Sequence, residues 1–266
     1  MYRLSVEEVA FAMGLFGDYE IAAGYLMTTL GQMEKENLSG RLAAASHSLL
    51  ARELFRMKSE EDGELVEDLA RLVQAMTLAA RSVRCEQRSP TSEQAMTCFV
   101  HRNDIVYHAL EQNVVAELKP LGNANDVLQT IIDFVDMETE GAISEPLGTT
   151  YVTTLQSLRD LAQGDQKQRM LELTTSFLNP SDAQQLVADF VDPSITWGSI
   201  LFLETATGKN DAPLLANDGV LYALASERLW LFLISTQTGD QVTVYRDGKA
   251  TLRQLLSPLV TAWFGC

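Results

Sequence analysis

The sequence predicts an α+β fold that is internally duplicated and built on an antiparallel β-sheet flanked by helices. Hydrophobic residues recur with the period of an α-helix in some segments and alternate with the period of two in others. Short turns separate the alternating segments, and short turns join antiparallel strands. Helices come in groups, and then strands come in groups, which is typical of α+β proteins rather than of parallel α/β sheets.

Four helices are predicted at the start of the chain. Ser5 is a suitable N-cap for the first, because the acidic residues Glu7 and Glu8 follow in its first turn. An acidic turn at residues 59–64 separates the third from the fourth. In each helix the apolar residues fall on one side. The helices are predicted over residues 5–16, 21–30, 41–55 and 65–76.

From residue 83 the apolar residues alternate with polar ones, with the period of two that is typical of β-strands. Residues 89–92 and Arg102-Asn103-Asp104 have the composition of turns, and they separate strands that form a hairpin. A helix capped by Asn125 or Asp126 closes this group. The strands are predicted over residues 83–86, 96–101, 105–110 and 114–118, and the helix over residues 127–135.

The second half of the chain has a similar order of elements. Pro180 marks the start of a helix, since proline is well suited to the first helical position. Residues 207–219 are predicted to form a long loop between two strands. Helices are predicted over residues 151–161, 170–178, 180–190 and 252–259, and strands over residues 200–204, 220–225, 229–235 and 242–245.

The two halves superpose when the chain is shifted by about 124 residues, a period that indicates an internal repeat. The strand positions that begin at Met96 then fall on those that begin at Val220, and the helix positions that begin at Leu128 fall on those that begin at Leu252. The alternative is that any two segments made of a hairpin and a helix can be slid into agreement. We therefore expect two units, residues 1–142 with the helical lead and residues 143–266.

Composition excludes several classes of protein. With 46% hydrophobic residues the chain of 266 residues is globular, and 36 acidic against 20 basic residues give a net charge of −16, which disfavours nucleic acid as a partner. No apolar run is long enough for a membrane span, and the N-terminus lacks the pattern of a signal peptide. Three cysteines, an odd number, fit a reducing compartment. We expect a cytoplasmic protein without a membrane partner.

The motifs of common enzymes are absent from the sequence. No phosphate-binding glycine motif, no nucleophile elbow and no EF-hand loop occurs, so no cofactor is expected. Cys85, Cys98, His101 and His108 lie close enough in sequence to suggest a zinc site. However, Cys98 and His101 are an odd number of strand positions apart and point to opposite faces. No metal site and no catalytic residue is expected, and His47 is predicted to be a surface or capping residue.

Three residues are the candidates for binding. Leu214 and Leu215 form an apolar pair in the predicted polar loop, and such a pair can mark a contact with a partner. The alternative is that both leucines pack into the local core. Trp230 is the third candidate, although tryptophans in such positions are more often anchors of the core.

The organisation of the chain resembles the EspG-type chaperones of bacterial type VII secretion. The shared features are the helical lead, the segment Ser48-Leu-Leu-Ala-Arg-Glu-Leu54, the basic strand Arg81-Ser-Val-Arg84, and the final strand Gln241-Val-Thr-Val-Tyr-Arg-Asp247 before an amphipathic helix. The resemblance implies a quasi-two-fold arrangement, a cytosolic location and a non-enzymatic role that shields an apolar helical tip of a partner. The loop around Leu214 and Leu215 corresponds by its place alone.

These observations lead to the hypothesis of a protein-binding module, a chaperone or adaptor whose partner presents an apolar helical surface. A homodimer is left open. Two alternatives remain: a self-assembling structural or regulatory protein, and an enzyme with an unrecognised site between the two halves. An acidic cleft that held His47 or His101 beside a carboxylate would favour the enzyme.

Overall fold

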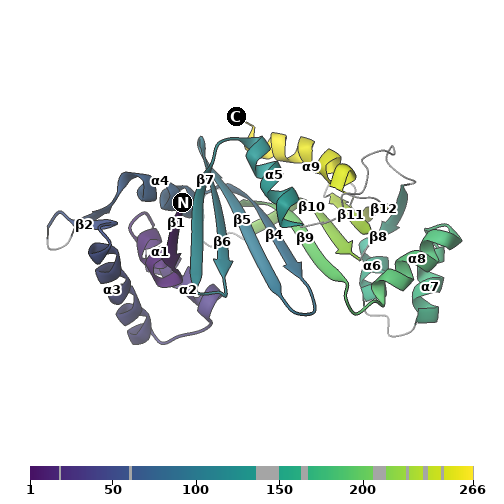
Figure 1. Cartoon of the computed structure of the whole chain (residues 1–266), viewed down its shortest axis with the longest axis horizontal. Helices are drawn as coiled ribbons and strands as arrows, with labels where there is room; N and C mark the ends of the chain where they lie inside the picture. The colour runs from purple at the N-terminus through teal and green to yellow at the C-terminus, as the bar shows by residue number, and fades with distance from the viewer. Residues whose placement is uncertain are drawn as a thin grey trace.

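The computed structural model describes residues 1–17, 19–59, 62–135, 150–162, 167–205, 214–225, 228–235, 239–246 and 249–265 (Figure 1). The elements of the first half are β1 (Tyr2–Ser5), α1 (Val6–Gly14), α2 (Tyr19–Leu30), α3 (Lys35–Ala51), β2 (Phe55–Met57), β3 (Gly63–Leu65), α4 (Glu67–Thr77), β4 (Arg81–Arg88), β5 (Glu93–His101), β6 (Asp104–Glu111), β7 (Val115–Leu121) and α5 (Ala124–Phe134).

In the described residues the second half follows a similar order, with three helices instead of four before its main strands and without the small β2–β3 hairpin. Its elements are β8 (Tyr151–Thr154), α6 (Leu155–Ala162), α7 (Lys167–Thr175), α8 (Pro180–Phe190), β9 (Thr196–Thr205), β10 (Leu214–Leu224), β11 (Leu229–Ser235), β12 (Gln241–Arg246) and α9 (Lys249–Phe264). No helix in the described part of the chain is long and apolar enough to cross a membrane.

One ten-stranded antiparallel sheet runs through the molecule, in the order β1-β7-β6-β5-β4-β9-β10-β11-β12-β8. The predicted α+β class with an antiparallel sheet flanked by helices is therefore confirmed. The halves meet at β4 and β9, and from this pair outward each half places its strands in the same succession. That equivalence is one of topology; duplication of the sequence stays a prediction. The predicted boundary at residue 142 lies outside the described residues.

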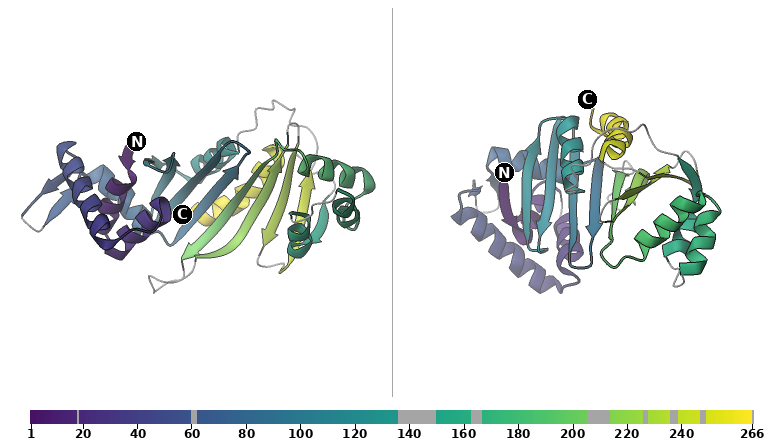
Figure 2. Two further views of the ribbon diagram at one scale, coloured as in Figure 1. Left: turned by 90° about the horizontal axis from the view of Figure 1, so that it is seen from below. Right: turned by 45° about the vertical axis from the view of Figure 1, so that its right-hand side comes forward.

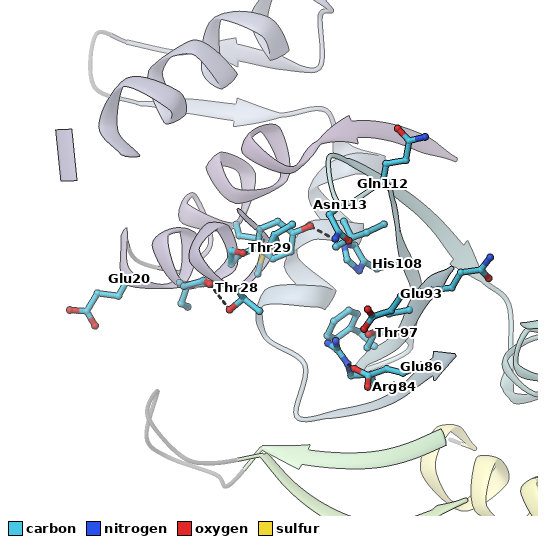
Figure 3. A pocket seen from close by; sticks show the side chains of 18 residues that line it. Glu20, Thr28, Thr29, Arg84, Glu86, Glu93, Thr97, His108, Gln112 and Asn113 are labelled. Carbon is cyan, nitrogen blue, oxygen red and sulfur yellow. Dashed lines mark hydrogen bonds and ion pairs between the residues drawn. The ribbon is translucent and has the colours of Figure 1, made fainter. Parts of the chain in front are cut away.

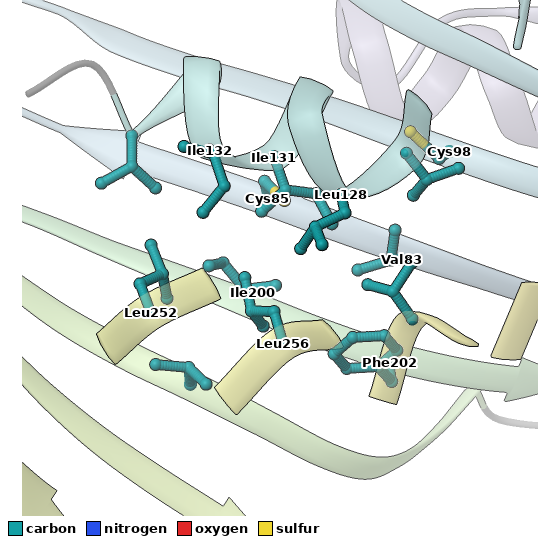
Figure 4. Close-up of a cluster of buried hydrophobic side chains, with 14 of the residues drawn as sticks. Val83, Cys85, Cys98, Leu128, Ile131, Ile132, Ile200, Phe202, Leu252 and Leu256 are labelled. Carbon is teal, nitrogen blue, oxygen red and sulfur yellow. The ribbon is translucent and has the colours of Figure 1, made fainter. Parts of the chain in front are cut away.

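One face of the sheet is covered at its centre by α5 and α9, which lie side by side (Figures 1 and 4). Leu128 and Ile131 of α5 and Leu256 of α9 pack on Cys85 of β4 and Ile200 of β9, and all are buried. A buried side chain of this size stabilises the fold by about 2 kcal/mol. This layer joins the two halves, because each half contributes both strands and a helix to it.

The opposite face carries two groups of helices at its two ends (Figure 2). We call α1–α4 the N-terminal block and α6–α8 the C-terminal block. The N-terminal block packs on β1, β6 and β7 through a cluster that includes Leu4, Val106 and Leu118. The C-terminal block packs on β10, β11 and β12 through a cluster that includes Trp230 and Val244. The blocks thus lie over the outer strands rather than over the central pair.

Several local predictions are confirmed and others are wrong. Ser5 is the N-cap of α1 in a capping box with Glu8, as its sequence context indicates. The cap of α5 is Asn123 and not Asn125 or Asp126. The edge strands β1 and β8 and the hairpin β2–β3 were not predicted, since each has at most four residues and too few alternations to reveal a strand. Phe55 consequently lies in β2 rather than in a helix.

Candidate functional site

The structure places Leu214 and Leu215 at the start of β10 and not in a loop. Their backbones pair with Thr205 and Glu204 of β9. The predicted loop over residues 207–219 is therefore wrong for residues 214–219, which belong to β10. Residues 207–213 and the side chains of both leucines lie outside the described part of the structure. A bulge between Ala216 and Asp218 accommodates polar residues that resemble a turn in the sequence.

Trp230 lies on β11 and is completely buried in the cluster beneath the C-terminal block. Its Nε1–H donates to Oδ2 of Asp189 at 2.8 Å, so the polar edge of the indole has a partner inside the protein. This is the core position given above as the more common role of such a tryptophan. Trp197, in contrast, is 37% exposed on β9.

The histidines and cysteines considered for zinc are divided between the two faces of the sheet. Cys85 and Cys98 are buried beneath α5, and burial raises the pKa of the Cys98 thiol to about 12 (Figure 4). His101 lies on the other face, where its Nδ1 is 3.0 Å from the carbonyl oxygen of Leu78. In the part of the chain that the structure describes, no three His, Cys, Asp or Glu side chains are grouped to hold a metal ion. His47 is exposed on α3.

Between the two blocks, the central strands β4 and β9 present a face that the helices reach at its borders: the Trp197 ring lies 4.6 Å from that of Phe190 of α8, and α2 lies across a pocket from Arg84 and Glu86. We call this surface the open face. Residues directly paired across an antiparallel sheet lie on the same face, and the β4–β9 register pairs Arg84 with Leu201 and Ser82 with Leu203. The open face consists of Arg84, Glu86 and Arg88 on β4, with the buried Ser82 at one end, and Trp197, Ser199, Leu201 and Leu203 on β9.

The two strands of the open face differ in chemistry. β4 presents charged side chains, among which Nε of Arg84 lies 2.6 Å from Oε1 of Glu86. β9 presents Leu201 and Leu203, which are half-buried and belong to none of the core clusters, together with the exposed Trp197. A charged row and an apolar row therefore run side by side along the centre of the sheet.

Glycine shapes the apolar row. Gly219 of β10 lies beside Leu201, and a Cβ at this position would stand 2.8 Å from Cδ2 of that leucine. Leu201 therefore leans over the neighbouring strand, where the missing side chain leaves room. On the other side of the sheet the ring of Tyr222 lies over Gly198, and its hydroxyl donates to Oε1 of Gln87 at 2.9 Å. This contact crosses the junction between the halves, from β10 to β4.

A pocket of about 760 Å³ borders the open face on the side of the N-terminal block (Figure 3). Helix α2 forms one wall, and β4, β5 and β6 form the other. At its base Tyr25 and His108 are linked, with the phenol oxygen 2.9 Å from Nε2 of the imidazole. Burial, assisted by the nearby Arg84 guanidinium, lowers the pKa of His108 to about 4. The imidazole is therefore neutral at pH 7.

The rim of the pocket is rich in carboxylates. Glu20, Glu86 and Glu93 line it together with one guanidinium, that of Arg84. Figure 3 shows Arg84, Glu86 and Glu93 gathered on the strands, with Glu20 on α2 at the opposite side. Since Arg84 is already paired with Glu86, the pocket carries an excess of negative charge.

With this geometry in view, comparison with known proteins gives the family. The model of the family described as uncharacterised protein YfjC matches residues 1–256. The chain belongs to the YfjC family. No curated protein matches the sequence. Among solved structures, the chain is similar to the type VII secretion system chaperone EspG5 of Mycobacterium tuberculosis, in a structure of its complex with the PE25-PPE41 dimer.

The similarity to EspG5 extends over nearly all of both chains. The TM-score is 0.61, and the match covers 99% of this chain and 96% of the other at 8% sequence identity. At such low identity the likeness shows a common fold. The resemblance noted in the sequence is therefore supported at the level of the fold.

The residues of the open face are not among the binding candidates that the sequence predicts. The run Ile200-Leu201-Phe202-Leu203 lies in a predicted strand, and its uninterrupted apolar character indicates a strand with two apolar faces. Ile200 and Phe202 belong to the core beneath α5 and α9, whereas Leu201 and Leu203 belong to the open face. This pattern was the available signal for a second apolar surface.

Proposed function

We propose that this protein is a non-enzymatic, cytoplasmic binding module that acts as a chaperone or adaptor and holds an apolar helical segment of a partner protein against its open face. The single observation that carries the proposal is the pair of half-buried leucines, Leu201 and Leu203, which lie on the same face of the central strands and belong to none of the described core clusters. A sheet with an apolar face is stable when a second layer covers that face.

The other face of the same two strands shows which kind of element could cover the open face. On their other face two helices, α5 and α9, bury the neighbouring residues Ile200 and Phe202. A helix laid on Leu201 and Leu203 would complete the equivalent three-layer arrangement. Full burial of the two leucines would add roughly 2 kcal/mol each, less the part already buried. That gain favours association when further contacts offset the loss of translational, rotational and side-chain entropy on binding.

The similarity to EspG5 supports a protein partner, because that structure contains the chaperone in complex with a protein dimer. It does not identify the partner of this chain. We also propose Leu214 and Leu215 as contact residues. The start of β10 pairs with the end of β9, and Ala216, the residue after Leu215, lies opposite Leu203. Both leucines thus border the open face along the backbone.

The chemistry of the pocket supports a non-enzymatic role. Its histidine is buried, bound to Tyr25 and has a pKa lowered to about 4, which is far from the value suited to proton transfer at neutral pH. Neither His47 nor His101 lines this pocket. The arrangement named above as favouring an enzyme, one of these two histidines in an acidic cleft, therefore does not describe this pocket.

The test is affinity purification from the native host with identification of bound proteins by mass spectrometry. We expect a protein with an apolar helical segment to be captured by the native chain and lost with Leu203→Asp. Val152→Asp is the matched control, because Val152 is 57% exposed on the edge strand β8, far from the open face. Melting temperatures of both variants exclude unfolding as the cause.

Two outcomes would contradict the proposal. Equal capture by Leu203→Asp and the native chain would exclude the open face, and retained capture by both Leu214→Asp and Leu215→Asp would exclude the start of β10. If light scattering showed that the pure protein assembles through the open face, the self-assembling alternative would replace the proposal.

A further inference from the structure

The two rows of the open face differ in a way that specifies the partner further. An α-helix is about 10 Å wide and strands lie about 4.8 Å apart, so one helix resting on β9 also extends over β4. The apolar row would then meet one side of that helix, and the charged row would meet its flank. A partner apolar on all sides would take the charges of β4, including the Arg84–Glu86 pair, out of water, which is unfavourable.

The length of the apolar row indicates the length of the segment. Leu203 stands at one end of the row, and Trp197, which packs on Phe190 of α8 and is 37% exposed, stands at the other. At about 3.4 Å per strand residue the row measures about 20 Å. A helix that rises about 1.5 Å per residue covers this distance with about 14 residues.

The charge of the pocket indicates the charge on the side of the partner helix that would face it. Three carboxylates and one guanidinium line the pocket, and Nε of that guanidinium lies 2.6 Å from Glu86. Within the described residues, neither Glu20 nor Glu93 forms an ion pair. Arg88 lies opposite Glu93 in the strand register but is not part of the pocket lining. A lysine or arginine of the partner would complement this excess, and the rings of Phe99 and Tyr25 in the pocket wall suit its aliphatic stem.

We propose that the open face binds an amphipathic helix of a partner protein, with its apolar side on Leu201 and Leu203 and a basic flank directed over β4 into the pocket between α2 and β5. This inference rests on the proposed function and names the chemistry of the partner. The large negative charge of the chain, −16, also attracts a basic segment over longer distances.

The test uses two synthetic helical peptides of about 14 residues, the length that the row accommodates. Both have the same leucine side, and their flank is lysine in one and glutamate in the other. Fluorescence anisotropy measures their binding to the full chain. We expect the lysine peptide to bind at least about fivefold more tightly, and Glu93→Lys to reduce its affinity about fivefold, the effect of one exposed charge pair.

Glu172→Lys is the matched control, because Glu172 is an exposed residue of α7 in the C-terminal block and the substitution changes the net charge equally. We expect it to leave the affinity unchanged. An equal effect of Glu172→Lys and Glu93→Lys would show general attraction by net charge and overturn the inference. Equal or tighter binding of the glutamate peptide would overturn it as well.

The two proposals fail in different ways. If both peptides bind equally and Leu201→Asp abolishes both, the open face is a binding surface and only the basic flank is wrong. If neither peptide binds, the inference is overturned, while capture of a native partner decides the proposed function separately. If Leu203→Asp dissociates an oligomer of the pure chain, the occupant is a second copy and both proposals are wrong.

Discussion

The two helical blocks cover the same face of one sheet, but different interactions attach them. The N-terminal block relies on apolar side chains, with Val9, Leu26, Leu69 and Val73 completely buried, and among its described residues one carboxylate, Glu8, is buried. The C-terminal block contains two buried carboxylates on a single helix: Asp182 and Asp189 both lie on α8. Both blocks thus pack on the sheet through apolar clusters, and the C-terminal block adds the ion pairs of these two aspartates to that packing.

The aspartates of α8 act as two anchors to the strands. Asp189 accepts two hydrogen bonds from the guanidinium of Arg228, at 2.8 and 2.7 Å, and one from Trp230. Asp182 accepts a hydrogen bond from Tyr151 of β8 at 2.6 Å and pairs with Arg246 of β12. Burial by itself raises the pKa of each aspartate, but these donors bring both pKa values below the ordinary range.

The largest effect is expected at the better buried anchor. Asp189→Ala removes the acceptor shared by Arg228 and Trp230, so a half-buried cation loses this ion pair and a buried indole N–H loses its acceptor. We expect the free energy of unfolding to fall by about 4 kcal/mol, measured by urea denaturation. Glu172→Ala, an exposed change on α7, is the control and should have little effect. Similar values for the two variants would show that ion pairs do not anchor the C-terminal block.

The stabilities of the two blocks should depend differently on pH. The pKa of His108 is about 4 in the folded chain and about 6.5 in the unfolded chain. As the pH falls, the unfolded chain therefore takes up a proton at a higher pH than the folded chain does. Stability is full above pH 6.5 and declines as the pH falls toward 4, by about 3 kcal/mol in total. His108→Gln should flatten the unfolding free energy over this window.

The aspartates act at lower pH. Their pKa values are lowered in the folded state, so their contribution is present above pH about 4 and is lost as the pH falls through the folded values. Hydrogen exchange at a series of pH values measures each block separately. Loosening of α2 below pH 6.5 is expected before loosening of α8 below pH 4, and the reverse order would contradict the assignment.

A smaller effect is expected at the buried carboxylate of the N-terminal block. Glu8 accepts hydrogen bonds from Ser48 at 2.7 Å and from Arg52 at 2.8 Å. Glu8→Ala should lower the unfolding free energy by about 2 kcal/mol, because Arg52 is 42% exposed and water can replace its partner. A loss as large as that for Asp189→Ala would remove the contrast between the blocks.

The smallest expected effect concerns the cap of α1. Oγ of Ser5 accepts the backbone N–H of Glu8 at 3.1 Å. Ser5→Ala should lower the unfolding free energy by about 1 kcal/mol, and Ser5→Asp should restore most of it, since aspartate is also a good N-cap. Thermal unfolding measures both, and an unchanged melting temperature for Ser5→Ala would show that the cap does not contribute.

Much of the fold could be predicted from the sequence because the signals are local. The strands around Cys98, Tyr107 and Leu231 alternate, and the helix that contains Ile131 has a helical period. The site was harder to predict. Residue type and a predicted loop point to Trp230 and Leu214, whereas Leu201 lies inside a predicted strand, where nothing local shows that one of its faces stays uncovered.

The α+β class, the order of most elements and the preference of particular side chains for burial follow from the amino-acid sequence, because the hydrophobic period can be seen along the chain. The pairing of β4 with β9 and the position of β1 and β8 at the edges are seen only in the folded chain. The same holds for the half-buried position of Leu201 and Leu203 between two blocks of helices. The physical reason is that periodicity shows that a side chain prefers burial, while its neighbours depend on pairings between residues far apart in the chain.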